Sequence, residues 1–347
     1  MKVAVIFNDS SIDTPAVSPV KNNTELGFKP YFAISKNDPL QDFRDIVTAL
    51  EKSGYEAYLL NIRDDINLFI EDFITNKPNV IFNLVELYKE NPKLEMPFAG
   101  ILELLKTPIT GAPPIALGTC QNKTLTKKIL KKAGIRTPEF RFIEKQEKVY
   151  RHGLNYPVIV KPAFEDASVG IENDSIVYNQ NELRKRIEHV FEQYKQPVLL
   201  EEFIEGRELN VAVMGDKHPE ALPISEIDFS RMPKHLHNIV SYQAKWDPYH
   251  EAYHKTIPIC PAKLPAKIER EAKKTALTCF RTVGCRDYSR VDMRLSKDNK
   301  LYVLEVNPNP DLTEGAGFMR SAHAAGYSYK KAIKMIVDLA WARRIRK

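Results

Sequence analysis

The sequence is poor in cysteine, with four among 347 residues, and no two of them have the spacing of a CxxC motif. The missing spacing argues against a zinc knuckle and against a dithiol redox motif. Isolated thiols are typical of a reducing compartment, so we predict a cytoplasmic protein. Long apolar runs are also missing: none approaches the roughly 20 residues that cross a bilayer, and the apolar start MKVAVIFND is too short for a signal peptide. No membrane partner is expected.

A strong charge of one sign is lacking as well. The 51 basic and 45 acidic residues give a formal net charge of +6, and the two signs are interspersed along the chain. Nucleic-acid-binding proteins usually have a denser basic stripe with interleaved aromatic residues, so no nucleic-acid partner is predicted. A mildly basic cleft for phosphate groups is compatible with this composition.

A length of 347 residues is too great for one ordinary core, and we predict three units, at 1–115, 116–205 and 206–347. The first unit alternates apolar strands with amphipathic helices, which predicts a small doubly wound α/β domain. Its strands are expected at 3–7, 55–61 and 79–85.

The second and third units mix short strands with helices and are predicted to be α+β. The second opens with a lysine-rich helix at 122–133 and contains a loop at 163–172. In the third, a long loop is expected at 228–255, and strands at 286–295 and 300–306 form a hairpin through the turn KDNK.

Carboxylate and amide side chains end the apolar strand in LYVLEVNPNP. Side chains in a strand have a period of two, so Glu305 and Asn307 share a face. The strand YSRVDMRL places Arg290, Asp292 and Arg294 on one face, and pairing of the two strands would bring Asp292 beside Glu305. Oxygen ligands suit Mg²⁺, and an arginine on the same face suits a phosphoryl-handling centre. The alternative is a surface hairpin with an Arg290–Glu305 ion pair.

Two further motifs suit a nucleotide. Lys161 ends an apolar strand just before the loop EDASVG, where Ser168 and Gly170 would let backbone amides approach an anion. In VLLEEFIEGRE, backbone groups from Glu202 to Ile204 suit the edge of an adenine ring, and Glu208 suits ribose hydroxyls. The alternatives are an exposed turn and an edge strand with solvated acids.

The order of the motifs decides between these alternatives. It runs through Lys123 in NKTLTK, Lys161 in VIVKP, the Ser-Val-Gly loop, LLEEFIEGRE, Arg290 and Asp292 in SRVDMRL, and Glu305 and Asn307 in LEVNPNP. This series resembles the ATP-grasp ligases, and among them the D-alanine–D-alanine ligases most closely. The resemblance covers about 225 residues, from Asn122 to the end, and extends to YQAKW (242–246) and CPAKLP (260–265).

The resemblance implies an ATP-grasp fold, in which the central and C-terminal units clamp ATP. It assigns the phosphates to Lys123, Lys161 and Lys245, under a loop around Ser168 and Gly170. It also assigns the adenine amino group to Glu201, the ring to the main chain around Glu202, Phe203 and Ile204, and the ribose to Glu208.

The resemblance further implies two Mg²⁺ ions, replaceable by Mn²⁺, on Asp292, Glu305 and Asn307, with Glu305 bridging them. A substrate carboxylate would attack the γ-phosphorus of ATP to give an acyl phosphate, and an amine would then displace phosphate. Arg290 would stabilise the oxyanion of the tetrahedral intermediate, a role worth roughly 10²–10³ in rate.

The substrate pocket departs from the D-alanine ligase pattern. The segment FNDSSIDTPAVS (7–18) lacks the family's glutamate for the first alanine, and its serine and tyrosine partners fall on Ala167 and Trp246. After Asn307, the family's glycine becomes Asp311 and its carboxylate-binding serine becomes Ala316. We therefore expect an amine other than D-alanine, one with a cationic or hydrogen-bonding group facing Asp311, unless Asp311 only caps the next helix.

A second resemblance is to a group of ligase-like ATP-grasp proteins, through FNLVE and the segment NPDLTEGAGFMRSAHAAGYSY. It suggests that Glu86 and Glu95 contact a substrate ammonium and that Arg320 contacts a carboxylate. Because the glycines usually found between the two glutamates are replaced by LYKENPKL, a helix-start acid and an exposed arginine stay open as alternatives.

We predict an ATP-dependent ligase that joins a small-molecule carboxylate and an amine, either amino acids or peptide-like molecules. A homodimer is left open. The alternatives are a true D-alanine–D-alanine ligase and a nucleotide-binding protein without catalysis.

Overall fold

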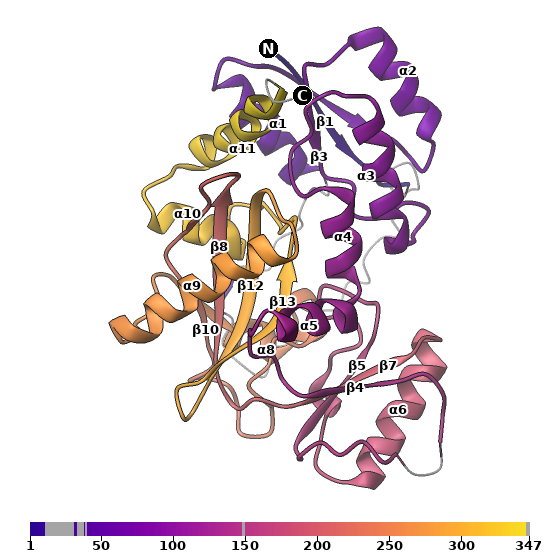
Figure 1. Ribbon diagram of the computed structural model, residues 1–347, viewed down its shortest axis with the longest axis vertical. Helices are drawn as coiled ribbons and strands as arrows, with labels where there is room; N and C mark the ends of the chain where they lie inside the picture. The colour runs from indigo at the N-terminus through magenta and orange to yellow at the C-terminus, as the bar shows by residue number, and fades with distance from the viewer. Residues whose placement is uncertain (11–30, 33–37, 39, 148–149, 345–347) are drawn as a thin grey trace.

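The computed structural model describes residues 1–10, 31–32, 38, 40–147 and 150–344 (Figure 1). The segment 7–18, in which the sequence lacks the family's glutamate, lies outside the described residues from residue 11 on. No helix within the described ranges is long and apolar enough to cross a membrane.

The N-terminal sheet is parallel, with strand order β2-β1-β3. Its strands are β1 (Lys2–Phe7), β2 (Glu56–Asn61) and β3 (Val80–Asn83), and its helices are α1 (Gln41–Glu51), α2 (Ile66–Asn76) and α3 (Glu95–Leu104). Alternate residues of β1 face opposite layers: Val3 and Val5 pack with α1, whereas Ala4 and Ile6 pack with α2 and α3. A strand covered on both faces must be apolar where it is covered, as β1 is from Val3 to Phe7, and the predicted doubly wound unit is confirmed.

The central sheet is antiparallel, with strand order β4-β7-β5-β6. Its strands are β4 (Phe140–Ile143), β5 (Val158–Pro162), β6 (Ile176–Val177) and β7 (Val198–Glu202). Helix α6 (Gln180–Tyr194) packs on one face through Leu183, Ile187 and Val190. Helix α5 (Lys123–Lys132) precedes the sheet, and a short 3-10 helix, η2 (Asn173–Ser175), follows the predicted loop.

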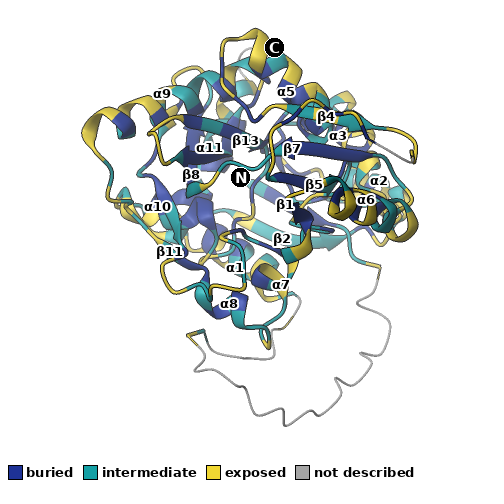
Figure 2. Ribbon diagram, turned by 90° about the horizontal axis from the view of Figure 1, so that it is seen from below, coloured by how far each residue is buried: buried dark blue, intermediate teal, exposed yellow. Residues whose placement is uncertain are grey.

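The C-terminal sheet has the order β11-β10-β8-β12-β13, with β9 beside β8. Its strands are β8 (Gly206–Gly215), β9 (Glu220–Ala221), β10 (Ser225–Asp228), β11 (Ile257–Ile259), β12 (Asp287–Ser296) and β13 (Leu301–Asn307). Helix α9 (Ala266–Thr282) covers one face, and its outer side is exposed while the strands beneath it are buried (Figure 2). The predicted hairpin of the last two strands is confirmed.

Four helices are not predicted by the sequence patterns. Helices α7 (Tyr242–Trp246) and α8 (Glu251–Lys255) lie in the expected loop at 228–255, and at five residues each they are too short to leave a periodic pattern. Helix α4 (Pro114–Gln121) begins at a proline, which suits a first helical position but suggests a turn when read in sequence. Helix α10 (Gly317–Ala324) follows Gly315 and starts on glycine, a poor helix former. A 3-10 helix, η1 (Pro92–Leu94), precedes α3.

The last helix, α11 (Tyr329–Arg343), packs between the two sheets, and its core includes Ala212 and Tyr288 of the C-terminal sheet. It packs beside α1 on the N-terminal sheet, and Ile333, Ile336 and Val337 share a buried core with Val3 and Val5 (Figure 1). At its end, the Arg343 guanidinium contacts both carboxylate oxygens of the fully buried Asp287. The predicted unit boundaries stay a prediction, but one core is built from both ends of the chain.

Candidate active site

A cavity of about 490 Å³ lies between the central and C-terminal sheets. It is lined from β5, β7, β8, β12 and β13, from the loop at 163–172, and from the segments at 239–258 and 311–320. Most of the predicted site residues face this single space, although they are spread over more than 150 positions of the sequence.

The register of β12 and β13 places Asp292 opposite Glu305 and Arg290 opposite Asn307, as the alternation predicts. The Arg290 guanidinium donates to both oxygens of Asp292 at 2.8 Å. Arg290 is therefore paired with Asp292, and the alternative of an Arg290–Glu305 ion pair is wrong. The Asn307 amide donates to the same carboxylate at 3.0 Å, and Asn210 on β8 donates at 2.8 Å. Burial raises the pKa of Asp292, but the nearby guanidinium outweighs this and the pKa is lowered.

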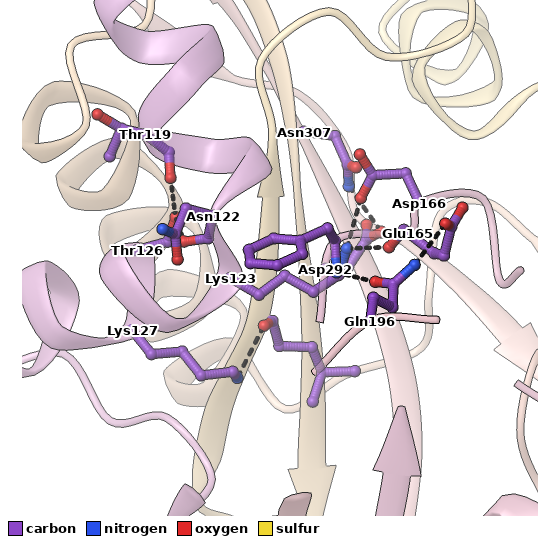
Figure 3. Close-up of polar contacts among 12 residues, drawn as sticks. Thr119, Asn122, Lys123, Thr126, Lys127, Glu165, Asp166, Gln196, Asp292 and Asn307 are labelled. Atoms are coloured by element: carbon purple, nitrogen blue, oxygen red, sulfur yellow. Dashed lines mark hydrogen bonds and ion pairs between the residues drawn. The ribbon is translucent and has the colours of Figure 1, made fainter. Parts of the chain in front are cut away.

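Glu305 has no hydrogen bond or ion pair with any residue that the structure describes. A β-bulge after Asp292 leaves Leu304 unpaired, and its carbonyl accepts a hydrogen bond from Lys127 at 2.9 Å (Figure 3). The available donors are two carboxylates and an amide oxygen, a set that fits Mg²⁺, which completes its shell with water and phosphate oxygens. The described residues contain no larger metal-binding group of His, Cys, Asp or Glu.

Glu201 lies between two lysines in the floor of the cavity. Its side chain is 1% exposed, with the ammonium groups of Lys127 and Lys161 each 3.0 Å from one carboxylate oxygen. Burial raises the pKa of Glu201, but these two cations outweigh it and lower the pKa to about 2. The Glu201 Oε1 atom is fully buried and has no aligned hydrogen bond within the described structure, despite the short distance to Lys127.

Lys123 points toward the loop at 163–172 rather than toward β13 (Figure 3). Its ammonium donates to the Asp166 carboxylate at 2.5 Å and to the Glu165 carbonyl. Burial lowers the pKa of Lys123, but Asp166 and then Glu305 outweigh it, and the pKa is raised. The lysine is therefore held as a cation within the field of the Glu305 carboxylate.

The loop at 163–172 is fastened to the segment at 240–246. The Ser168 hydroxyl donates to the Val240 carbonyl at 2.9 Å, and the Trp246 indole donates to the Ala167 carbonyl at 2.9 Å. Gly170 has φ +72°, and a Cβ atom there would lie 2.3 Å from the Pro162 ring, so this position requires glycine. Ala167 and Trp246 replace two members of the family's recognition triad, and their contact is a hydrogen bond from the Trp246 side chain to the Ala167 backbone.

The predicted adenine and ribose residues line one end of the cavity. The Phe203 amide donates to the Pro157 carbonyl, and the Glu202 side chain accepts from Asn155, so neither group is turned toward the cavity. Phe203 and Ile204 line the cavity wall. Glu208 lines it too, with its carboxylate 2.9 Å from the Arg294 guanidinium.

Residues predicted for substrate binding occupy the other end. Lys245, Trp246, Asp311 and Arg320 line the cavity, and the Arg320 guanidinium donates to the Gly315 carbonyl at 2.6 Å. Asp311 is not a helix cap: it accepts from the Thr313 amide in a turn, whereas Ala316 is the N-cap of α10.

Glu86 and Glu95 do not line the cavity, but charged groups of the cavity are close enough to change their pKa values. Glu86 follows β3, and Glu95 is the first residue of α3, the position of the helix-start alternative. The Glu86 side chain is exposed at the surface; partial desolvation, then the charge of Asp311, raises its pKa. Burial, then the charge of Glu86, raises the pKa of Glu95 to about 8. Neither has an ion pair with a described residue.

Three polar residues of the site have no role predicted from the sequence. Lys127 lies one helical turn after Lys123, and that spacing could have placed it on the same face. Strand alternation puts Arg294 on the face of Asp292 but gives it no function. Asn210 gives no signal, because a single amide in the apolar strand β8 becomes meaningful only through its cross-strand position opposite Asp292.

Comparison with known proteins agrees with this geometry. A family model described as D-ala D-ala ligase C-terminus matches residues 129–338. The chain belongs to the D-alanine–D-alanine ligase family. It is therefore an ATP-grasp ligase, an enzyme that forms C–N bonds with ATP, and the predicted ATP-grasp fold is confirmed.

Relatives in this family include proteins both with and without a named activity. The chain is 31% identical over 313 residues to D-alanine–D-alanine ligase A of Bacillus cereus, covering 88% of this chain and 94% of that protein. It is 30% identical over 304 residues to the protein y4sG of Sinorhizobium fredii, covering 86% and 87%.

Solved structures of D-alanine–D-alanine ligases have the same fold. The Bacillus anthracis enzyme complexed with ATP superposes with a TM-score of 0.72 at 25% identity, covering 100% of this chain and 99% of that one. The Coxiella burnetii enzyme has a TM-score of 0.68 at 19% identity, which shows the fold alone.

Proposed function

We propose that this ligase joins the carboxylate of one amino acid or small peptide-like acid to the amine of another through an acyl phosphate. The observation that carries the proposal is the paired strands β12 and β13, which present Arg290, Asp292, Glu305 and Asn307 to a cavity with a nucleotide end and a substrate end. Family membership supplies the reaction class, and this face supplies the groups that the reaction requires.

At the nucleotide end, the Glu201 carboxylate lines the cavity, and its oxygens can accept a hydrogen bond from a donor in addition to contacting Lys127 and Lys161. The exocyclic amine of adenine is such a donor, and a guanine presents an oxygen at that position instead. Lys123, Lys161 and Lys245 would bind the phosphates. Because Asp166 holds Lys123 before the nucleotide arrives, ATP phosphates must compete with this carboxylate for the ammonium.

In the first step, a carboxylate oxygen of the acid substrate attacks the γ-phosphorus, and ADP leaves. In the second, the amine nitrogen attacks the acyl carbon, the C–O bond to phosphate breaks, and the nitrogen loses a proton. Arg290, kept charged by Asp292, would stabilise the oxyanion between these events. Asp292, Glu305 and Asn307 would hold Mg²⁺, which when bound neutralises phosphate charge.

The substrate end supports an amine other than D-alanine. Asp311 lines the cavity beside Arg320, so an amine substrate with its carboxylate on Arg320 would bring a second group close to a carboxylate. That arrangement is favourable only when the second group is cationic or a hydrogen-bond donor. Glu86 and Glu95 suit an ammonium of the acid substrate. A true D-alanine–D-alanine ligase is the second candidate, favoured by the named activity of relatives at 31% identity.

Phosphate release from ATP, measured across a panel of amino acids, tests the reaction. Release that requires an amino acid other than D-alanine supports the first candidate. If D-alanine alone drives cleavage of ATP to ADP and dipeptide, at a kcat in the usual range of roughly 1–10³ s⁻¹, the second candidate is correct.

Melting temperature tests the nucleotide. ATP with Mg²⁺ should raise it, because a ligand that binds only the folded state stabilises that state. The substitution Lys161→Ala should remove most of the shift, and Lys128→Ala, at an exposed position of α5, should leave it. An equal shift with GTP would contradict the assignment of adenine to Glu201.

A further inference from the structure

Arg294 is a buried arginine in the wall of the active-site cavity, and the reaction described above gives it nothing to do. It is 3% exposed and lies on the same face of β12 as Asp292 and Arg290. The register of β8 and β12 places it directly opposite Glu208, and its guanidinium lies 2.9 Å from the Glu208 Oε2 atom.

The remaining contacts of Arg294 join three segments around that end of the cavity. Its guanidinium donates to the Gly206 carbonyl at 3.1 Å and to the Asn238 carbonyl at 2.5 Å. The rings of Phe203 and Phe229 lie 5.4 and 5.6 Å from it, at cation–π distance. One side chain therefore links β8, the connection after β7 and the segment that follows β10.

Stability alone does not account for this ion pair. Burial lowers the pKa of Arg294, and burial also raises the pKa of Glu208, so desolvation outweighs the attraction between the two charges. A buried pair of this kind is often no more stable than an apolar pair of the same size. An apolar side chain of similar size could fill the position if packing were its only duty.

The geometry of Glu208 shows what the pair can do. Its Oε2 atom is held by Arg294, whereas its Oε1 atom has no hydrogen bond to a described residue. Glu208 lines the cavity four residues after Ile204, at the end predicted for adenine. A carboxylate that is fixed at one oxygen and open at the other accepts hydrogen bonds from hydroxyl groups, and it accepts them more strongly while it is ionised.

We propose that Arg294 is a positioning residue for ribose recognition, which holds one oxygen of Glu208 and aims the other at the 2′ and 3′ hydroxyls of ATP. The inference rests on the proposed binding of ATP in this cavity. It assigns to Arg294 a specificity that packing cannot supply: discrimination between ATP and nucleotides that lack a ribose hydroxyl.

The test is the dissociation constant of the full-length enzyme for ATP, 2′-deoxyATP and 3′-deoxyATP, each with Mg²⁺, by titration calorimetry. A hydrogen bond to a charged group is worth roughly tenfold or more in affinity, so the wild type should prefer ATP to at least one deoxy analogue by about that factor. In Arg294→Met the preference should fall to within about threefold. ATP affinity should also begin to fall at a higher pH on acidification than in the wild type, because Glu208 loses the cation that lowers its pKa.

Two further variants keep the outcome clear if Arg294→Met folds poorly. Arg294→Lys retains the positive charge but loses the planar set of donors of the guanidinium, and it should partially reduce the preference for ATP over the deoxy analogue. Glu208→Gln should abolish it with Arg294 in place. An unchanged preference in both Arg294 variants, with a lost preference in Glu208→Gln, overturns the role of Arg294. No preference in the wild type also overturns it, whereas no ATP binding by the wild type contradicts the proposed function itself.

Discussion

The two ends of the cavity compensate their charges differently. At the nucleotide end, each buried carboxylate has a cation: Glu201 with Lys127 and Lys161, Glu208 with Arg294, and Asp292 with Arg290. Near the substrate end, outside the cavity lining, Glu86 and Glu95 have raised pKa values and no ion pair with a described residue. The nucleotide end is thus organised before its ligand arrives, whereas the two carboxylates near the substrate end have no paired cation among the described residues. Substitutions of the paired residues should therefore change stability at the first end, and substitution of Asp311 should change amine selectivity at the second.

The largest effect is expected where the two ends meet. Glu305→Gln removes one charge from the predicted metal face, and turnover should fall by roughly 10²–10³ or more, since a lost catalytic interaction of several kcal/mol has that effect. The fold should persist because Glu305 has no partner among the described residues. Steady-state phosphate release, with circular dichroism as a check on folding, measures both. Asp298→Asn, in the exposed turn after β12, is the matched control, and near-normal turnover in Glu305→Gln would refute the metal assignment.

A large stability loss is expected at the nucleotide end. Lys127→Met leaves Glu201 buried with one cation instead of two, and breaking a buried pair costs about 3–5 kcal/mol in the free energy of unfolding. Urea unfolding without nucleotide measures it. Lys128→Met, an exposed neighbour on α5, should change the free energy of unfolding by less than about 0.5 kcal/mol. Equal effects of the two substitutions would show that the pairing at this end does not contribute to stability.

An altered selectivity without loss of stability is expected at the substrate end. Asp311→Gly should change which amine supports phosphate release, favouring smaller neutral amino acids, because a carboxylate no longer faces the bound amine. The ratio of kcat/KM between two amines should change by roughly 10-fold or more, the usual effect of a lost charged hydrogen bond. Glu271→Gln, exposed on α9, serves as control. An unchanged amine profile would mean that Asp311 only shapes its turn with Thr313.

The smallest effect is a pH dependence of stability. The pKa of Glu95 is raised to about 8, so the folded enzyme retains a proton that the unfolded chain releases near pH 4.5. The folded state binds more protons over this interval, and stability falls as pH rises from about 4.5 to 8. Glu95→Gln should flatten this decline in a melting-temperature series without ligand. A wild-type melting temperature that rises steadily across the interval, and is unaffected by the substitution, would count against an uncompensated carboxylate here.

Much of the site is predictable because it lies on strands. The period of two is enough to assign Arg290 and Asp292 to one face of β12, and Glu305 and Asn307 to one face of β13. Lys127 and Arg294 are harder, because a lysine on a lysine-rich helix and an arginine in a strand are ordinary surface residues until tertiary packing buries them. Their partners, Glu201 and Glu208, lie more than 70 positions away, and no local pattern encodes that distance.

The fold shows the same division. Elements with clear local patterns, such as β1, α5, β12 and β13, are predicted with approximately correct bounds. Short elements that tertiary contacts stabilise, α7 and α8 above all, are not. The contact of Trp246 with the Ala167 carbonyl cannot be predicted from the sequence either, because the acceptor is a backbone atom and any residue type supplies one.

The packing of α11 against the N-terminal sheet has a consequence for the order of events on the ribosome. The face of β1 that carries Val3 and Val5 is made long before its partners Ile333 and Ile336, which follow more than 300 positions later in the sequence. Because chains emerge at about 5–20 residues per second, this apolar face waits tens of seconds for its cover. Helix α1 covers part of this face early, but a nascent chain that ends before Tyr329 exposes the rest. We expect such stalled or truncated chains to aggregate or engage chaperones, whereas chains completed through Arg343 close the core at once.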